Sequence, residues 1–379
     1  MAQSFDVCIR GAGIVGRTLA LLLARDRLRV ALVGPADAPQ EPHEDVRAYA
    51  LNAASRALLE SLRAWPDAHH ATPVARMEVH GDQDGSVHFD AASQHAQALA
   101  WIVDVPALEL RLAEAVRYQP QVELVSHPVP ATLTAVCEGR ASRTRDEFGV
   151  EFAVTPYAQH AIAARLRCEH AHGQVARQWF GADGSILAFL PLGGSEGNAV
   201  AIVWSVPQEQ APQLLALAPE DFARHLQAAS QGALGQLELT SKRAAWPLQQ
   251  AQANHWCGPL AAEGAHGPHG WVLAGDAAHN VHPLAGQGLN LGLADAQALA
   301  HTLHAREAWR SIADLRLLRR YERERKAALL PMGLAMDGLQ QLFTRREAPL
   351  QALRNWGLKG FERSGTLKHW MARQAMGTN

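Results

Sequence analysis

The sequence lacks several features that would assign a protein to a specialised class. Its 379 residues include four cysteines, none in a Cys-x-x-Cys pair, so neither a disulfide framework nor a zinc knuckle is indicated and a reducing compartment fits best. No run approaches the roughly 18 apolar residues that span a bilayer. Met1 leads directly into an apolar segment without the features of a signal peptide, and we therefore expect a cytoplasmic protein.

An excess of charge of one sign is also missing. Lys and Arg number 35, Asp and Glu number 37, and the formal net charge is −2 at pH 7. Without an overall basic field, electrostatic capture of nucleic acid is not indicated, and we expect no nucleic-acid partner. Hydrophobic residues make up 48% of the chain and charged residues 19%, which is typical of globular proteins with a packed core.

The first 35 residues contain the pattern of a βαβ unit. Apolar runs at 7–9 and 30–33 predict buried strands, and residues 18–24 continue in helical period after a glycine-rich turn. The turn carries G-x-G-x-x-G, formed by Gly11, Gly13 and Gly16. In such a unit the first glycine permits a tight turn, the second lets a pyrophosphate approach the backbone, and the third lets helix and strand pack closely. The pattern predicts a dinucleotide site at the start of the helix.

One element of this unit is missing. An acidic residue usually follows the second strand and holds the adenosine ribose, but Gly34 occupies that position here. Asp37, a little further along, is the nearest acid. Either Asp37 reaches the ribose or ribose binding is weakened.

A second glycine-rich stretch, AGDAAHNVHPLAGQGLNLG at 274–292, follows the apolar run at 271–273. His279 and His282, with only Asp276 nearby, lack the ligand number and spacing of a metal site, so we expect no bound metal. A helical run follows the glycines of the GQG sequence. The stretch therefore predicts a second strand-loop-helix junction, which presents a carboxylate and a helix N-terminus to the same ligand.

Segments distributed along the whole chain resemble one known family. The stretch at 275–292 is similar to the second flavin motif of the class A FAD-dependent aromatic hydroxylases, which are flavoprotein monooxygenases. DVRAYALNAASRALLESL at 45–62 resembles the D-x-R-x-x-A-L-x-x-x-S segment of their ubiquinone-biosynthesis branch, and YAQHAI at 157–162 resembles its Y-x-Q-x-A-I. Further matches to that branch are IVWS at 202–205, YERERK at 321–326, LF at 342–343, LRNWGL at 353–358 and AMG at 375–377.

The resemblance implies an α/β fold and a flavin-centred reaction. The fold is a Rossmann-like FAD-binding domain of the para-hydroxybenzoate hydroxylase type, with an inserted antiparallel-sheet substrate domain and C-terminal helices. In the reaction NAD(P)H reduces FAD, O₂ adds to give a C4a-hydroperoxide, and a phenolic ring attacks its distal oxygen. Because the cofactor carries this chemistry, no catalytic side chain is expected. The sequence indeed contains no G-x-S-x-G nucleophile motif.

The resemblance also implies which residues bind FAD. Asp276 meets the ribityl and pyrophosphate region, and the backbone N–H groups of Leu289 and Asn290 face flavin N1 and O2, where donors stabilise the negative charge of reduced flavin. Arg47 matches an arginine that takes part in flavin movement; the alternative is a loop arginine in solvent. The histidines of the stretch are expected to pack against the cofactor loop. The predicted cofactor-binding set is Gly11, Gly13, Gly16, Arg47, Glu138, Gly139, Asp276, Pro283, Gly286, Gly288, Leu289 and Asn290.

Two departures from the family pattern fall close together. In the motif A-D-G-x-x-S-x-x-R, Gly139, Ser142 and Arg145 match, but Glu138 replaces the aspartate. The longer carboxylate moves its oxygens by about an ångström, enough to lower a rate, which brings NAD(P)H use into question. Upstream, the β-hairpin that the family inserts after VELV at 122–125 has no counterpart. We therefore expect the three-stranded accessory sheet to be missing.

The motifs predict a discontinuous arrangement. The FAD-binding domain comprises 1–75, 101–147 and 268–310, the substrate domain 76–100 and 148–267, and the C-terminal helical region 311–379. Three tryptophans either line the substrate cavity or belong to the core, namely Trp204, Trp246 and Trp271. A group of basic residues predicts a solvated helix face, with attraction to anionic lipid as the alternative; it consists of Arg316, Arg319, Arg320, Arg323, Arg325 and Lys326.

The expected function is NAD(P)H- and FAD-dependent hydroxylation of a polyprenylated phenol or quinone precursor by O₂ in ubiquinone biosynthesis. A ubiquinone-biosynthesis complex and peripheral contact with the inner membrane are expected partners, because such a substrate is very apolar. Two alternatives remain open. One is an FAD monooxygenase of a soluble phenol or secondary metabolite, and the other is a low-turnover flavin-binding scaffold subunit of a quinone-synthesis complex.

Overall fold

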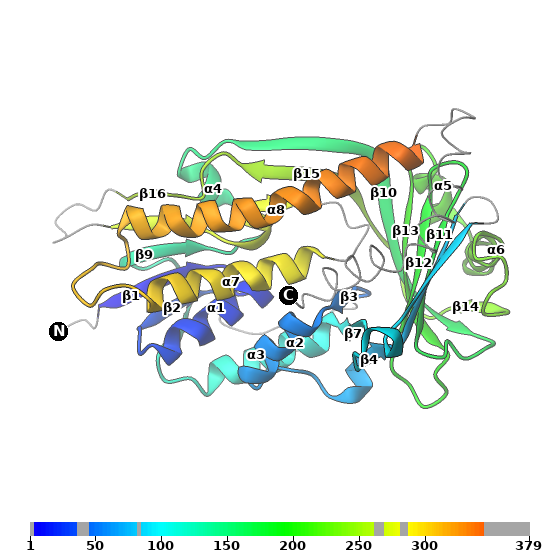
Figure 1. Cartoon of the computed structure of the whole chain (residues 1–379), viewed down its shortest axis with the longest axis horizontal. Helices are drawn as coiled ribbons and strands as arrows, with labels where there is room; N and C mark the ends of the chain where they lie inside the picture. The colour runs from blue at the N-terminus through cyan, green and yellow to red at the C-terminus, as the bar shows by residue number, and fades with distance from the viewer. Residues whose placement is uncertain (1–3, 36–44, 82–84, 261–268, 281–286, 345–379) are drawn as a thin grey trace.

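Two large sheets lie at opposite ends of the molecule, with a small sheet between them (Figure 1). The computed structural model describes residues 4–35, 45–81, 85–260, 269–280 and 287–344, the last fourteen of these by their backbone only. A six-stranded sheet lies toward the end where the chain begins, and a nine-stranded sheet forms the other end. None of the described helices combines the length and apolar character needed to cross a membrane.

The six-stranded sheet is mainly parallel and is built on the expected βαβ unit. Its order is β16 (Cys257–Pro259), β17 (Gly270–Leu273), β9 (Ala131–Val136), β1 (Phe5–Arg10), β2 (Val30–Val33) and β8 (Val122–Val125). Only β16 pairs in antiparallel orientation. Most residues of the central strands are buried because helices and loops cover both of their faces.

Four helices pack around this sheet, of which the first two each lead into one of its strands and the last two follow its final strand along the chain. They are α1 (Ile14–Arg25), α3 (Val105–Arg117), α7 (Gly288–His304) and α8 (Leu315–Thr344). Helix α1 packs against both α3 and α7, and α8 lies along α7 (Figure 1). Short elements complete this part of the chain, namely α2 (Ala53–Ser61), α4 (Arg143–Glu147), η1 (Ala68–His70), η2 (Ala92–Gln94) and η3 (Gly275–Ala277).

The connection from β8 to β9 is unusually direct. Residues 126–130 join the two strands and form no strand of their own, so the missing hairpin predicted at this position is confirmed. A three-stranded antiparallel sheet nevertheless exists elsewhere, in the order β3 (Ala48–Leu51), β7 (Ala100–Asp104) and β4 (Ala71–Val74). It contributes segment 45–51, which belongs to one of the family-like motifs, and places it between the two large sheets.

The nine-stranded sheet has α5 (Ala211–Ala216) and α6 (Pro219–Ala229) against one face. Its strands are β5 (Arg76–His80), β6 (Ser86–Asp90), β10 (Phe152–Cys168), β11 (Val175–Phe180), β12 (Ile186–Pro191), β13 (Ala199–Pro207), β14 (Leu237–Leu239), β15 (Ala244–Ala253) and β18 (His279–Asn280). The alternating apolar runs at 186–192 and 199–206 pair as the antiparallel strands β12 and β13, as the antiparallel sheet expected for the substrate domain requires.

Strand β10 runs through both ends of the molecule. Phe152, at its start, packs against the core of the six-stranded sheet, whereas Ile162 and Leu166 belong to the core between the nine-stranded sheet and α6. A register irregularity between Pro156 and His160 separates the two parts. Strands β5 and β6 join the nine-stranded sheet, as the proposed insertion at 76–100 requires. Strand β16, by contrast, pairs within the six-stranded sheet. We keep the predicted domain division as a proposal.

Candidate flavin site

Three glycines shape the turn from β1 to α1. Gly11 has a φ of +113°, and a Cβ there would lie 2.5 Å from the carbonyl oxygen of Cys137. A Cβ at Gly16 would overlap the carbonyl oxygen of Gly11, so only glycine allows this helix to approach this turn. Gly13 differs, because a Cβ there would meet no protein atom within 4 Å. The turn therefore leaves open space at the start of α1, where the sequence predicts a pyrophosphate.

The missing acid after β2 has a local physical reason. A Cβ at Gly34 would lie 2.5 Å from the Cβ of Ala12, inside the first glycine turn. A carboxylate at this position would therefore push the turn away from the strand. Asp37, the other candidate for ribose binding, lies outside the described residues.

The loop after β17 is held from beneath by a buried carboxylate. Gly275 has a φ of +64°, and its N–H donates to Asp295 Oδ2 at 2.9 Å. Asp295 is fully buried on α7 and also accepts from His279 Nε2 and from Arg325 Nε, each at 2.6 Å. Asp295 was not among the predicted site residues, although an acid within an apolar helix run was a signal. The prediction that Arg325 lies on a solvated face is wrong, because Arg325 is buried against this carboxylate.

The charges around Asp295 offset its burial. Burial alone raises the pKa of Asp295, but His279 and Arg325 together hold it below its ordinary value. The His279 ring also stacks on Trp256, with centroids 5.0 Å apart. His279 therefore packs and holds the loop, as expected for this histidine; His282 lies outside the described residues.

Asp276 combines two properties that rarely occur together. Its side chain is open to solvent, yet protein surrounds the carboxylate closely enough that desolvation raises its pKa. His279, Arg140 and Arg47 lower that pKa in part, and Asp295 raises it further. A carboxylate enclosed by protein but not covered by it fits a ligand-contacting position.

The middle motif supports the same loop. Arg145 is buried, donates to the carbonyl oxygen of Ala277 at 3.3 Å, and lies over the Phe152 ring, 3.6 Å from its centroid. Ser142 caps α4 by accepting from the Arg145 N–H. Gly139 has a φ of +77° and borders open space. The motif thus connects β9 to the underside of the Asp276 loop.

The longer side chain of Glu138 forms several hydrogen bonds within this motif. Its carboxylate accepts from Ser142 Oγ at 2.7 Å, from Thr144 Oγ1 at 2.6 Å and from the Thr144 N–H at 3.1 Å, and Arg10 Nε lies 3.5 Å away. Burial raises the pKa of Glu138, but these donors more than offset it and hold the pKa below the ordinary value. The longer acid therefore keeps α4 in place, and its effect on NAD(P)H use stays a prediction.

Asn290 joins two motifs that are far apart in the sequence. Its Oδ1 accepts from the Asn52 N–H at 3.0 Å and from Ser55 Oγ at 2.7 Å, and its Nδ2 donates to the carbonyl oxygen of Ala50 at 2.9 Å. These contacts place segment 50–55 against the start of α7. Pro283 and Gly286, both predicted to bind the cofactor, lie outside the described residues.

The first turn of α7 borders open space and offers backbone N–H donors to a ligand. A Cβ at Gly288 would meet no protein atom within 4 Å. The first intrahelical N–H bond comes from Leu291 to Gln287, so the N–H groups of Gly288, Leu289 and Asn290 precede it. Such N–H groups at a helix start favour an anionic ligand.

Arg47 is exposed, but Asp45 holds its guanidinium in place. Its Nε donates to both carboxylate oxygens of Asp45 at 2.9 Å, and its Nη2 donates to Oδ2 at 2.5 Å. This hydrogen bonding raises the pKa of Arg47, although burial acts in the opposite direction. The guanidinium also lies near enough to Asp276 to lower the pKa of that carboxyl. Segment 45–47 and the Asp276 loop therefore face the same region.

Two of the three candidate tryptophans belong to the core. Trp204 pairs with Ile162 on the face of the nine-stranded sheet that packs on α6, where it contacts Phe222. Trp271 stacks on Phe148, with ring centroids 5.3 Å apart. Trp246 pairs with Ala161 on the opposite face. Of the three, only Trp246 remains a candidate for the substrate cavity.

The chemistry of the described residues suits a dinucleotide rather than a metal. No group of three or more His, Cys, Asp or Glu side chains within the described ranges is arranged to hold a metal ion. All four cysteines are free and buried, and burial raises the pKa of Cys137 to about 12. By contrast, two helix starts border open space, and Val15 of α1 packs against Gly275 and Gly292 beside the start of α7. FAD fits this donor set.

Comparisons with known proteins agree with this assignment. The family described as FAD binding domain matches residues 113–330. The 3-demethoxyubiquinol 3-hydroxylase of Escherichia coli is 31% identical over 99% of this chain and 99% of its own length. Ubiquinone hydroxylase UbiL of Rhodospirillum rubrum is 30% identical over 98% and 90%. In fold, the chain is similar to PqsL of Pseudomonas aeruginosa, with a TM-score of 0.72, 24% identity and coverage of 91% and 98%.

Proposed function

The chain belongs to the FAD binding domain family and is an FAD-dependent aromatic hydroxylase, and we propose that it hydroxylates the ring of a polyprenylated phenol in ubiquinone biosynthesis. The reaction consumes O₂, NAD(P)H and a proton and yields the hydroxylated ring, water and NAD(P)⁺. The observation that carries this proposal is the sequence similarity, over nearly the full length of both chains, to two hydroxylases of ubiquinone or its precursors.

We assign the cofactor contacts to the predicted residues that border open space. Gly13 and the start of α1 would take the pyrophosphate, Asp276 the adjoining ribityl region, and the first N–H groups of α7 the pyrimidine edge of the flavin. When bound, FAD takes hydride from NAD(P)H and activates O₂ for transfer of one oxygen atom to the ring. Arg47, held by Asp45, would present its positive charge to the same region.

The Asp276 assignment has a direct test. Replacing Asp276 by Ala removes the exposed carboxylate but none of the hydrogen bonds described for the loop beneath it, so the chain should fold and purify without its yellow colour. The measurement is the ratio of 450 nm to 280 nm absorbance. Asp183→Ala, in an exposed turn near the α5 end of the large sheet, is the control and should retain FAD. Stoichiometric FAD in the Asp276 variant would overturn the assignment.

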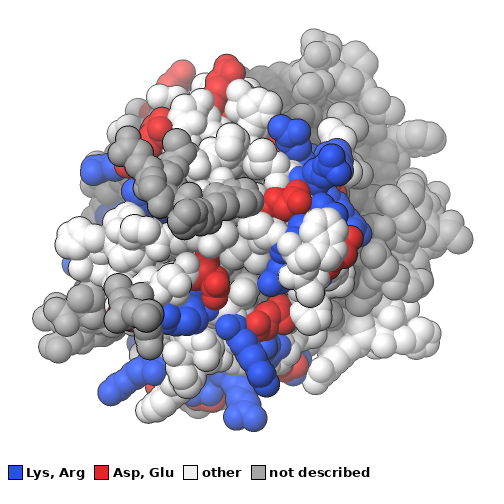
Figure 2. Space-filling view, turned by 90° about the vertical axis from the view of Figure 1, so that its left-hand side faces the viewer, with Lys and Arg blue, Asp and Glu red and all other residues white. Residues whose placement is uncertain are grey.

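The finer proposals concern delivery of an apolar substrate. We propose that the protein takes part in a quinone-synthesis complex and contacts the membrane peripherally. The membrane contact is supported by exposed arginines near the start of α8, which are Arg316, Arg319, Arg320 and Arg323. Trp309, in the preceding turn, is 77% exposed. Figure 2 views this end of the molecule and shows Lys and Arg interleaved with Asp and Glu, which favours weak contact. Flotation with anionic vesicles, compared with neutral ones, tests the contact.

The main experiment is NAD(P)H-dependent O₂ uptake with and without a prenylated phenol, with product analysis by mass spectrometry. Stimulated uptake that yields a ring-hydroxylated product supports the proposal. Equal hydroxylation of phenols lacking the prenyl chain would favour a soluble substrate. The direct β8–β9 connection and Gly34 favour a second candidate, a low-turnover flavin subunit. Uptake that yields only hydrogen peroxide would support that candidate.

A further inference from the structure

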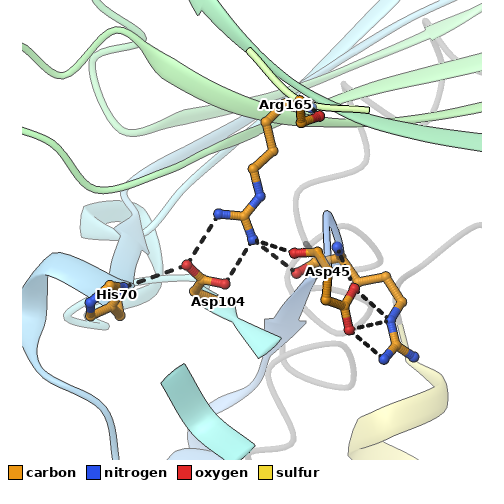
Figure 3. Close-up of polar contacts among 6 residues, drawn as sticks. Asp45, His70, Asp104 and Arg165 are labelled. Atoms are coloured by element: carbon orange, nitrogen blue, oxygen red, sulfur yellow. Dashed lines mark hydrogen bonds and ion pairs between the residues drawn. The ribbon is translucent and has the colours of Figure 1, made fainter. Parts of the chain in front are cut away.

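A cluster of charged side chains joins the nine-stranded sheet to the segment that carries Arg47 (Figure 3). Arg165 projects from β10, and its guanidinium donates to the two carboxylate oxygens of Asp104, at 2.7 and 3.1 Å. Its Nη2 atom also donates to the backbone carbonyl oxygen of Asp45 at 3.1 Å and to that of Arg47 at 3.5 Å. One side chain therefore holds two separate stretches of chain.

The partners of Arg165 are themselves connected. Asp104 ends β7 and pairs with Ala48 of β3, directly after the Arg47 segment. The Val105 N–H donates to the carbonyl oxygen of Arg47 at 3.4 Å, and His70 Nδ1 lies 3.5 Å from Asp104 Oδ2 on the other side. The position of the Arg47 backbone thus depends on Asp104, and the position of Asp104 depends on Arg165.

This ion pair is stronger than an ordinary surface pair. The side chains of Arg165 and Asp104 are 25% and 17% exposed, so protein shields much of their attraction from solvent. The planar guanidinium meets the carboxylate with two hydrogen bonds and still has a donor for the two carbonyl oxygens. A lysine at this position would have a single ammonium group and could not span the same set of acceptors.

Arg165 also lies on the face of the sheet that matters for substrate. Side chains alternate along β10, so Arg165 shares a face with Ala161, the partner of Trp246, and faces away from α6. The same face carries the remaining tryptophan candidate for the substrate cavity. A shift of this sheet on substrate binding would therefore reach the Arg47 segment through Arg165.

We propose that Arg165 is a positioning residue that couples the substrate sheet to Arg47, so that Arg47 is placed for the flavin only while the Arg165–Asp104 pair is intact. Arg165 itself touches neither cofactor nor substrate in this proposal. The inference rests on the proposed function, because it takes Arg47 as a flavin-contacting residue. The proposed coupling depends on the single ion pair between Arg165 of the nine-stranded sheet and Asp104 of the three-stranded sheet.

The test uses the full-length, FAD-loaded protein carrying Arg165→Lys or Arg165→Met. Displacing a positioned group by an ångström costs up to about a hundredfold. We expect Kd for FAD to rise about tenfold or more and the change in flavin absorbance on substrate addition to shrink. We also expect kcat to fall with little change in KM for NAD(P)H. Equilibrium dialysis and difference spectroscopy measure the first two effects without reference to turnover.

Arg167→Met is the matched control. Arg167 lies on the same strand and pairs with Glu238 at 3.1 Å, but its side chain is 60% exposed and the pair lies at the surface. This variant should keep wild-type FAD affinity and spectra. Arg165 variants that fold and match it in both readouts would overturn the proposal.

Asp104→Asn keeps the test decisive if an Arg165 variant fails to fold. It preserves the shape of the side chain and removes its charge, so it should reproduce the Arg165 effects, and the double variant should add little to either single change. Fully additive effects would overturn the coupling. A wild-type protein that binds FAD but hydroxylates no phenol would refute the proposed substrate, while the FAD affinities would still decide the role of Arg165.

Discussion

The two large sheets are stabilised in different ways. Around the six-stranded sheet, Gly11 and Gly16, which have no room for a Cβ, fix the β1–α1 turn, and the buried Asp295 holds the loop after β17. The nine-stranded sheet instead packs apolar side chains against α5 and α6, with Trp204, Phe189 and Phe222 among the largest. Apolar packing tolerates substitutions of similar volume, whereas a buried charge or an overlapping backbone does not. The flavin end should therefore be the less tolerant of the two.

The largest expected effect is that of Asp295→Asn. Removing this charge leaves Arg325 buried without its partner and weakens the bonds from Gly275 and His279. We expect a loss of about 3–5 kcal/mol in the free energy of unfolding, the usual cost of breaking a buried pair. Urea unfolding followed by circular dichroism measures it.

The matching change at the other end is Asp183→Asn. Asp183 is exposed in the turn before β12 and accepts from the Ser185 N–H at 2.9 Å. Its loss should cost about 1 kcal/mol or less. Equal destabilisation by the two variants would contradict the contrast between the sheets.

The next effect separates folding from cofactor binding at one turn. Gly16→Ala forces a methyl group into the carbonyl oxygen of Gly11 and should cost about 2–3 kcal/mol. Gly13→Ala places its methyl group in open space, so it should cost about 1 kcal/mol or less through the helix cap but should weaken FAD binding clearly. Thermal unfolding and FAD titration of both variants measure the two effects. A Gly13 variant with unchanged FAD affinity would remove this glycine from the site.

A smaller effect is expected in acid. The folded-state pKa of Glu138 is below its ordinary value, so its stabilisation is fully present above about pH 4.3 and is lost as the pH falls through the lower folded value. Glu138→Gln should therefore lose about 1.5 kcal/mol at neutral pH and show a flatter dependence of Tm on pH below 4.3. Parallel Tm profiles of wild type and variant from pH 3 to 5 would contradict this.

At Trp204 no effect on hydroxylation is expected. Its indole nitrogen has no partner among the described residues, and the ring packs on Phe222 of α6, away from the Arg165 face. Trp204→Phe should therefore change stability by less than about 1.5 kcal/mol and leave hydroxylation unchanged. A raised KM for the phenol at unchanged Tm would place this tryptophan in the substrate cavity after all.

The sequence predicted the parts of this molecule that local backbone constraints determine. The roles of Gly11 and Gly16 follow from the turn that they occupy, and the missing hairpin after β8 follows from a short segment at 126–130 that contains Pro128 and Pro130. The motif at 45–62 was found by resemblance, but its sequence does not indicate that Ser55 contacts Asn290, 235 positions later.

The parts that the sequence did not predict depend on pairing between distant segments. In the sequence, Arg325 resembles the exposed arginines of the same charged helix. Its partner Asp295 lies 30 positions earlier on a different helix, and the contact between the two removes Arg325 from solvent. Arg165 meets Asp104 across 61 positions, and the fold of two sheets brings them together. Periodicity indicates which face of an element is buried, but not which partner a buried charge will meet.

The length of β10 limits how such enzymes can be recombined. Because one uninterrupted strand has Phe152 in one core and Leu166 in the other, a chimaera that exchanges the substrate sheet between relatives must cut through a shared structural member. A crossover placed beside Pro156, where the register already shifts, would need a matching crossover in β15, because β15 pairs with both parts of β10. Crossovers elsewhere in the strand would mismatch its neighbours on one side.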